Sequence, residues 1–175
     1  KNIVIYMGSS SNVHPNESVE LSELLRRNDW LERNFLIIRP HPAHKRIWDD
    51  WNVSGTYVWP RGMELYERSE VHLEILFSAA TLVIGVNTSG FWDALAYDCP
   101  VASLKLMKTS FQENTSHFKF AVDSGLKVFE NLTDLESEFE VIVSSSKNLK
   151  ARLLPNFGNV YATFLQEMKL ENGFV

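Results

Sequence analysis

Short apolar runs rich in β-branched residues alternate along the chain with longer stretches in which apolar residues recur every three or four positions. The short runs predict strands buried on both faces, and the longer stretches predict helices with one apolar side. We expect strands at residues 2–7, 35–38, 56–59, 82–86, 101–104 and 127–129. We expect helices at residues 15–28, 44–51, 67–80, 91–97, 115–123, 134–143 and 161–170, and a loop at the serine-rich residues 144–148.

The clearest unit in this pattern runs from Thr81 to Leu106. A buried run is followed by Thr88, Ser89 and Gly90, then by apolar residues at helical spacing, and Pro100 separates that helix from the next buried run. Small hydroxyl residues are typical of a helix start, and glycine lets the backbone approach a ligand. The unit therefore predicts a strand, a turn, a helix and a second strand, with the turn placed to bind an anion.

The alternation of strands and helices predicts an α/β fold, a parallel sheet flanked by helices on both faces. Ligands in such sheets bind at the carboxyl ends of the strands. Three loops follow predicted strands, at residues 8–11, 39–44 and 87–90, and each carries donors suited to a phosphate or a sugar. We therefore expect these loops to meet at one edge of the sheet.

The composition fits a single domain, residues 1–175, because 45% of the residues are hydrophobic. The formal net charge of −5 argues against a broad nucleic-acid-binding surface. The lone cysteine, Cys99, excludes an intramolecular disulfide and a cysteine-based zinc site, and it favours a reducing, cytoplasmic location. No apolar run approaches the ~20 residues of a membrane span, so we predict no transmembrane segment. Peripheral membrane association of a longer protein is left open.

The order of the motifs resembles the C-terminal, donor-binding half of a GT-B glycosyltransferase. A strand with a Gly-Ser loop, a strand ending in Arg-Pro-His-Pro, and a strand followed by Thr-Ser-Gly, a helix and Cys-Pro-Val succeed one another within residues 3–106. This order is similar to that of capsule and teichoic-acid-type polymerases, bacterial sialyltransferases and nucleotide-sugar epimerases. The resemblance implies a Rossmann-like domain, one half of a GT-B fold, that binds a nucleotide-sugar donor without a metal or another cofactor.

The resemblance also implies an N-terminal acceptor-binding domain that this chain lacks. The chain opens on a strand directly after Lys1, so we expect it to be the C-terminal half of a longer protein. The catalytic base is expected in the missing half, and the catalytic residues are therefore unknown.

The same resemblance assigns donor contacts residue by residue. In those families a His-Pro element and a later Ser/Thr pair contact the nucleotide or its phosphates, which points to His41, Thr88 and Ser89. In several GT-B families an acidic residue early in the next helix binds the ribose. Asp93 stands at that place, where glutamate is commoner.

The full set of predicted donor-binding residues is Gly8, Ser9, Ser10, Arg39, His41, Glu64, Thr88, Ser89, Gly90 and Asp93. Several of them have an ordinary structural interpretation. Arg39 could pair with an acidic neighbour, and His41 could hold the end of its strand through a backbone hydrogen bond. Thr88 and Ser89 could cap the helix, a role compatible with anion binding. Glu64 could belong to a surface loop.

These patterns predict the donor-binding domain of a glycosyltransferase acting in surface polysaccharide or glycan biosynthesis. One alternative is a non-catalytic nucleotide-binding or interaction module with the same fold, and another is a nucleotide-sugar epimerase. A dinucleotide-binding glycine motif, a P-loop and a nucleophile elbow are all absent from the sequence. The other histidines show no metal-ligand spacing, so we predict no metal site.

Overall fold

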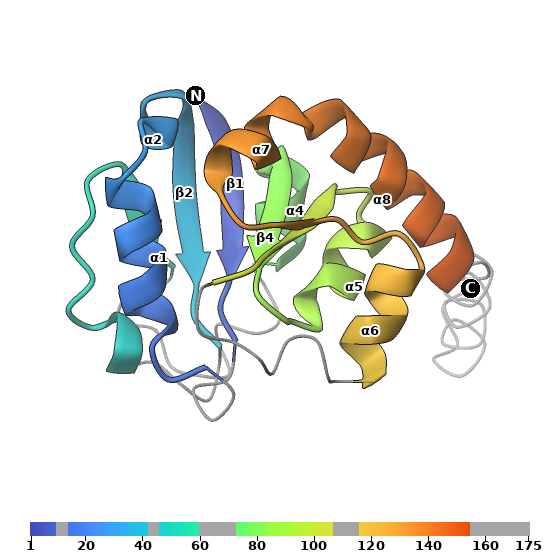
Figure 1. Ribbon diagram of the computed structural model, residues 1–175, viewed down its shortest axis with the longest axis horizontal. Helices are drawn as coiled ribbons and strands as arrows, with labels where there is room; N and C mark the ends of the chain where they lie inside the picture. Colours follow the sequence, from blue (N-terminus) through green and yellow to red (C-terminus); the bar gives the residue numbers. More distant parts are fainter. Residues whose placement is uncertain (10–13, 42–45, 60–72, 107–115, 155–175) are drawn as a thin grey trace, which may run out of the picture.

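The computed structural model describes residues 1–9, 14–41, 46–59, 73–106 and 116–154 (Figure 1). In these residues six strands form one parallel sheet: β1 (Asn2–Met7), β2 (Asn34–Arg39), β3 (Thr56–Val58), β4 (Leu82–Gly85), β5 (Val101–Leu104) and β6 (Val128–Phe129). The strand order is β3-β2-β1-β4-β5-β6. This is the order of a Rossmann-like, doubly wound sheet, so the predicted fold class is confirmed.

The helices of the described residues are α1 (Glu17–Arg26), α2 (Trp30–Arg33), the short 3₁₀ helix η1 (Arg46–Trp48), α4 (Leu73–Ala79), α5 (Gly90–Ala96), α6 (Ser116–Asp123), α7 (Leu132–Ser137) and α8 (Phe139–Leu153). They cover both faces of the sheet. Residues of α1 and α7 pack in one apolar cluster, and residues of α4, α5 and α6 pack in another.

The side chains of strand β1 pack alternately into two apolar clusters, one on each face of the sheet. Val4 and Tyr6 belong to the cluster of α1 and α7, whereas Ile5 and Met7 belong to the cluster of α4, α5 and α6. Successive side chains of a strand point to opposite faces, which explains the alternation. All four are buried. The uninterrupted apolar run therefore indicates a strand covered on both sides, as predicted.

Helix α8 contradicts one prediction. Residues 144–148, expected to form a loop, lie within this helix. Ser146 is one of its buried residues, together with Ile142 and Leu149, and Ser146 Oγ accepts the Val101 amide at 2.9 Å. Serine has only a modest intrinsic helix propensity. Packing and hydrogen bonding against β5 outweigh that preference here.

The other helix predictions have mixed outcomes. The pattern misses α2, and the single helix expected at residues 134–143 is divided between α7 and α8. Of residues 44–51, those that the structure describes contain only η1. Gly125, with φ of 120°, follows α6 as predicted. The predicted helix at 161–170 lies outside the described residues.

The strand order reverses between β1 and β4, which is the switch point of the sheet. The chain leaves β1 for α1 on one face and leaves β4 for α5 on the other. Connections that diverge in this way open a crevice at the carboxyl ends of the strands, where Rossmann-like sheets bind ligands. Figure 1 shows the arrowheads of β1 and β2 side by side at this edge.

Candidate functional site

The predicted loops leave the sheet at the same level. In the parallel register Met7 pairs with Arg39 on one side and with Gly85 on the other. The segments that follow these three residues therefore begin side by side, as the sequence predicts. We refer to residues 8–16 as the β1–α1 turn, of which 8, 9 and 14–16 are described, and to residues 86–89 as the β4–α5 turn.

Gly8 brings the β1–α1 turn against the segment after β2. Its amide donates to the Arg39 carbonyl at 2.9 Å. A Cβ on Gly8 would lie 3.2 Å from the His41 backbone nitrogen and 3.4 Å from the Pro40 Cα. The absence of a side chain thus permits this close approach of two backbones. It sets the turn next to His41, whose side chain is half-buried.

A buried carboxylate, that of Glu17, accepts hydrogen bonds that hold the β1–α1 turn in place. The Ser9 amide donates to the two carboxylate oxygens of Glu17 at 3.0 and 2.9 Å, and the Tyr6 hydroxyl donates to Oε1 at 2.7 Å. Glu17 is 0% exposed and Ser9 is 2% exposed. Glu17 is absent from the residues predicted from the sequence. Its place in the first helical turn, where acidic residues are favoured, is the one signal that pointed to it.

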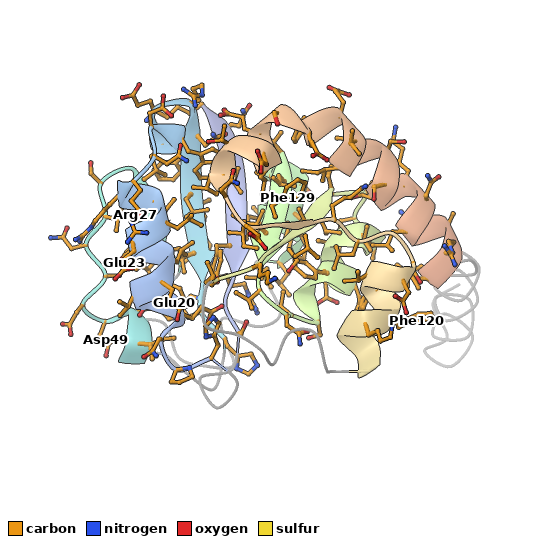
Figure 2. All side chains as sticks on the ribbon, viewed as in Figure 1. Glu20, Glu23, Arg27, Asp49, Phe120 and Phe129 are labelled. Atoms are coloured by element: carbon orange, nitrogen blue, oxygen red, sulfur yellow. The ribbon has the colours of Figure 1, made fainter. Side chains whose placement is uncertain are left out.

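The titratable groups of this turn have shifted proton affinities. Burial raises the pKa of Glu17 to about 7, although hydrogen bonds from Tyr6 and Ser9 act in the opposite direction. Burial raises the pKa of the Tyr6 phenol well above its usual value and lowers the pKa of His14. His14 Nε2 lies 3.7 Å from Glu20 Oε2, and Figure 2 places Glu20 at the end of α1 nearest this edge. Glu17 is therefore the group that changes charge near neutral pH.

In the β4–α5 turn a neutral hydroxyl, that of Thr88, accepts the hydrogen bond of a backbone amide. Thr88 Oγ1 accepts the Gly90 amide at 3.1 Å, which is a structural role for this predicted residue. A Cβ on Gly90 would lie 2.4 Å from Met7 Cε, so β1 packs against this glycine. Ser89 is exposed and its side chain makes no capping hydrogen bond. Ser89 is therefore the member of this turn best placed to meet a ligand.

Arg39, the last residue of β2, interacts electrostatically with Asp93 of α5. Burial lowers the pKa of the Arg39 guanidinium, and the nearby Asp93 carboxylate acts against this shift. Burial likewise raises the pKa of Asp93, and Arg39 acts against that shift. The two opposite charges therefore interact at the edge of the sheet, which agrees with the acidic pairing considered for Arg39. Two predicted donor-binding residues thus share one electrostatic environment.

The structure brings most of the predicted residues together at the carboxyl edge of the sheet: Gly8, Ser9, Arg39, His41, Thr88, Ser89, Gly90 and Asp93. Ser10 and Glu64 lie outside the described residues. Backbone packing or hydrogen bonding within the turns already accounts for Gly8, Ser9, Thr88 and Gly90. Donor contacts by any of these residues stay predictions.

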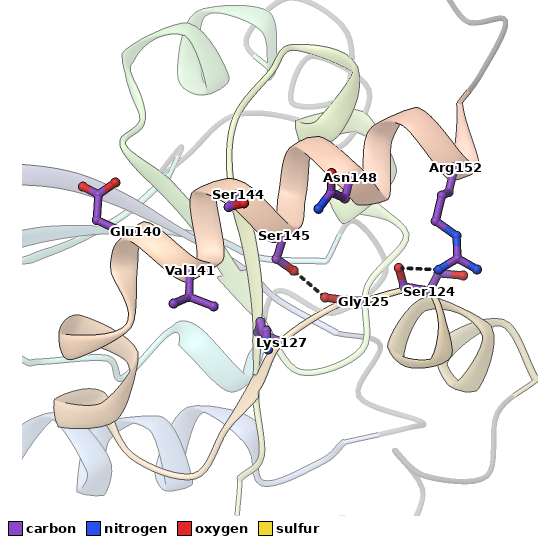
Figure 3. Close-up of a pocket in the computed structure, with 9 residues that line it drawn as sticks. All are labelled: Ser124, Gly125, Lys127, Glu140, Val141, Ser144, Ser145, Asn148 and Arg152. Carbon is purple, nitrogen blue, oxygen red and sulfur yellow. Dashed lines mark hydrogen bonds between the residues drawn. The ribbon is translucent and has the colours of Figure 1, made fainter.

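A separate hollow of about 580 Å³ lies between α8 and the turn that joins α6 to β6 (Figure 3). Lys127, Glu140 and Arg152 are among its lining residues. Ser145 Oγ donates to the Gly125 carbonyl at its wall. The hollow contains none of the predicted donor-binding residues, and β5 and β6 separate it from the switch point. It therefore offers positions for control variants.

Two general features of the described part of the chain bear on the predictions. Within it, no three His, Cys, Asp or Glu side chains are grouped closely enough to hold a metal ion. None of the helices resolved there combines the length and the apolar character that crossing a bilayer requires.

No protein-family model and no curated protein matches the chain, but solved structures do. The wall teichoic acid polymerase TagF soaked with CDPG has 11% identity and a TM-score of 0.57, over 96% of this chain and 43% of its own. The UDP-GlcNAc 2-epimerase from Neisseria meningitidis bound to UDP-GlcNAc has 14% identity and a TM-score of 0.54, over 95% and 44%. The spinosyn rhamnosyltransferase SpnG with spinosyn aglycone has 16% identity and a TM-score of 0.50, over 86% and 42%.

At 11 to 16% identity these likenesses establish the fold alone. The neighbours are glycosyltransferases and an epimerase of the GT-B type, so the expected Rossmann-like half of a GT-B fold is confirmed. The chain spans less than half the length of each structure it matches here.

Proposed function

We propose that this chain is the donor-binding domain of a glycosyltransferase acting in surface polysaccharide or glycan biosynthesis. One observation carries the proposal: Arg39, His41, Ser89 and Asp93 all belong to segments at the switch point of a Rossmann-like sheet. Sheets of this kind bind ligands at that place. The fold shared with glycosyltransferases and an epimerase supports the same interpretation.

In the proposed reaction negative charge moves onto the nucleotide that leaves the donor. His41 and Arg39 donate hydrogen bonds to its phosphates, and the Ser89 hydroxyl donates a third. Asp93 accepts from the ribose hydroxyls. The arrangement uses no metal ion, because side-chain donors offset the charge of the leaving group.

Two backbone amides near the switch point are already hydrogen-bonded within the protein. The Ser9 amide donates to Glu17, and the Gly90 amide donates to Thr88. The proposed phosphate contacts therefore come from side chains rather than from these two amides.

The missing half of the proposed enzyme supplies the acceptor site and the catalytic base. This chain alone is therefore expected to bind a nucleotide without turning it over. CDPG and UDP-GlcNAc, the ligands of two structural neighbours, make cytidine and uridine nucleotides the first probes.

Calorimetric titration with UDP, CDP, CMP and UDP-GlcNAc tests the proposal. We expect the native protein to bind at least one of them. Each lost charge-assisted hydrogen bond weakens binding by about tenfold or more, so a His41→Ala, Ser89→Ala double variant should lose at least that factor. The matched control is a Lys127→Ala, Ser144→Ala double variant in the hollow of Figure 3, which should bind as the native protein does.

Two results would overturn the proposal. One is a native protein that binds none of the probes, and the other is a double variant at the switch point that binds as tightly as the native chain. If the control variant loses nucleotide affinity and the switch-point variant does not, the nucleotide site lies in the hollow beside α8.

An epimerase is the second candidate, because the UDP-GlcNAc 2-epimerase from Neisseria meningitidis matches with a TM-score of 0.54. The two functions differ in their need for an acceptor. A longer protein containing this chain, incubated with UDP-GlcNAc alone, forms an epimer if it is an epimerase and does not if it is a transferase. Proton nuclear magnetic resonance of the anomeric region separates the two outcomes.

A further inference from the structure

Glu17 is the one acidic residue that is completely buried in the part of the chain that the structure describes. Water does not reach its carboxylate, so hydrogen bonds from the protein must replace hydration. The Ser9 amide, in the β1–α1 turn, donates to both carboxylate oxygens, and the Tyr6 hydroxyl, on β1, donates to one of them. The first turn of α1 is thus tied to the two segments that precede it in the sequence.

A continuous path of contacts leads from Glu17 to the proposed donor site. The carboxylate holds the Ser9 amide, and the neighbouring Gly8 amide donates to the Arg39 carbonyl. The Gly8 Cα packs so closely on the next segment that a Cβ would lie 3.2 Å from the His41 nitrogen. Displacement of the β1–α1 turn therefore displaces the backbone that carries His41.

We propose that Glu17 is a positioning residue for the donor site: through Ser9 and Gly8 it fixes the place of His41 at the switch point. The inference rests on the proposed function. Glu17 makes no contact with the donor, because it is 0% exposed and its two oxygens accept hydrogen bonds from the protein. Its role is to hold the backbone in the geometry that His41 needs.

The environment of Glu17 decides which substitutions test this role. Its titratable neighbours are Tyr6 on β1, Glu20 on α1 and His14 before α1, while Trp48 of η1 packs on the Tyr6 ring at 5.8 Å without charge. Glutamine keeps one oxygen, and placed where Oε1 lies that oxygen can accept from both the Tyr6 hydroxyl and the Ser9 amide. Alanine can accept neither hydrogen bond. Glu17→Gln should therefore preserve the turn, and Glu17→Ala should release it.

The affinity of the folded protein for a nucleotide is the first measurement. The probe is whichever of UDP, CDP, CMP and UDP-GlcNAc the native protein binds most tightly, titrated at low temperature where circular dichroism shows each variant to be folded. We expect Glu17→Ala to weaken binding at least tenfold and Glu17→Gln to stay within threefold of the native protein. Equal affinity of native protein and Glu17→Ala would overturn the inference.

Two controls separate positioning from a general loss of stability. Glu23→Ala makes the same substitution at an exposed position of the same helix, where Glu23 pairs with Arg27 at 3.5 Å (Figure 2). Leu149→Ala removes a buried side chain of α8 from the cluster on the opposite face of the sheet. Neither should change the affinity of the folded protein. A weakening by Leu149→Ala as large as that by Glu17→Ala would make the effect one of stability alone.

A measurement without nucleotide keeps the inference separate from the proposed function. Amide chemical shifts report the backbone geometry of Gly8 and His41 in the free protein. We expect Glu17→Ala to move both resonances and to speed hydrogen exchange at Gly8 at least tenfold, and Glu17→Gln to restore both. Unmoved His41 and Gly8 resonances would overturn the positioning role. If the native protein binds no nucleotide but these resonances move, the proposed function fails and the mechanical link to His41 stands.

If Glu17→Ala does not fold, Glu17→Asp takes its place. Aspartate keeps the charge but is one methylene shorter, so it cannot reach the Ser9 amide and the Tyr6 hydroxyl together. We expect the same direction of change in nucleotide affinity and in the Gly8 and His41 resonances. Native values for all of them in a folded Glu17→Asp protein would overturn the inference.

Discussion

Two strand-to-helix turns flank the switch point, and in each a different kind of side chain accepts a hydrogen bond from a backbone amide. Each has a backbone amide that no strand or helix partner satisfies. In the β1–α1 turn the carboxylate of Glu17 accepts the Ser9 amide inside the protein. In the β4–α5 turn the neutral Thr88 hydroxyl accepts the Gly90 amide in a half-buried position.

The difference assigns different roles to the two turns. The β1–α1 turn is held by a buried, ionisable group, Glu17. Its stability therefore depends on pH and on the hydrogen bonds that Ser9 and Tyr6 donate to Glu17. The β4–α5 turn is held by a group that does not titrate, and it leaves Ser89 exposed. We therefore interpret the first turn as a fixed wall of the crevice and the second as a surface for ligand contact.

Removal of the Glu17 side chain should have the largest effect on stability. Glu17→Ala leaves the Tyr6 hydroxyl and the Ser9 amide buried without an acceptor, and each unsatisfied group costs about 1–3 kcal/mol. We expect a loss of about 4 kcal/mol in the free energy of unfolding at pH 5, measured by urea denaturation. Glu17→Gln should lose less than about 1 kcal/mol, and equal losses for the two variants would contradict the hydrogen-bond account.

The pH dependence of stability should give the next largest effect. The folded protein raises the pKa of Glu17 from 4.5 to about 7, so it binds the proton more tightly than the unfolded chain does. The resulting stability is fully present below pH 4.5 and is lost as pH rises through 7. That rise in the pKa of Glu17 corresponds to about 3 kcal/mol.

Comparison of the native protein with Glu17→Gln isolates this contribution. Glutamine does not titrate, so the variant should be more stable than the native protein at pH 8 by about 3 kcal/mol relative to their difference at pH 4.5. The lowered pKa of His14 works in the opposite direction, since stability from its neutral form is lost as pH falls below 6.5. That contribution is present in both proteins and cancels. A difference that does not change with pH would place the native pKa of Glu17 near its ordinary value.

The sheet was predictable from the sequence because its strands are buried on both faces. Runs such as residues 82–86 consist of apolar residues whose local pattern and tertiary environment agree. The convergence of the three loops followed from one rule, that parallel strands end at the same edge. The register that pairs Met7 with Arg39 and with Gly85 confirms that the three loops begin side by side.

The failures arise where a distant partner decides the local structure. Residues 144–148 look like a loop, but Ser146 bonds to the Val101 amide 45 residues away. Glu17 looks like one more charged residue on a helix, and nothing in the local pattern shows that Tyr6 and Ser9 point at it. Hydrogen bonds of this kind depend on the completed fold, so periodicity cannot reveal them.

A substitution at Gly90 should have a smaller effect and tests what this glycine is for. A Cβ there would lie 2.4 Å from Met7 Cε, and the flexible methionine must move. Overpacking costs about 1–3 kcal/mol, and because the clashing atom is the far end of a flexible side chain we expect Gly90→Ala to lose about 1 kcal/mol of unfolding free energy, the low end of that range. In a Met7→Ala background the loss should vanish, because the clash is gone. A loss of nucleotide affinity without any loss of stability would show that Gly90 serves the ligand instead.

The Thr88 hydroxyl should give the smallest effect of the four. Thr88→Val keeps the shape of the side chain but removes the acceptor of the Gly90 amide, and the loss of one such hydrogen bond costs about 1 kcal/mol. Water can reach this half-buried position and replace part of the lost bond, whereas no water reaches Ser9. The loss should be the same at pH 5 and pH 8, and Thr88→Ser should restore most of it. A cost that changes with pH as the Glu17→Gln difference does would mean that both turns respond to one titrating group, and the division into a fixed wall and a contact surface would then be wrong.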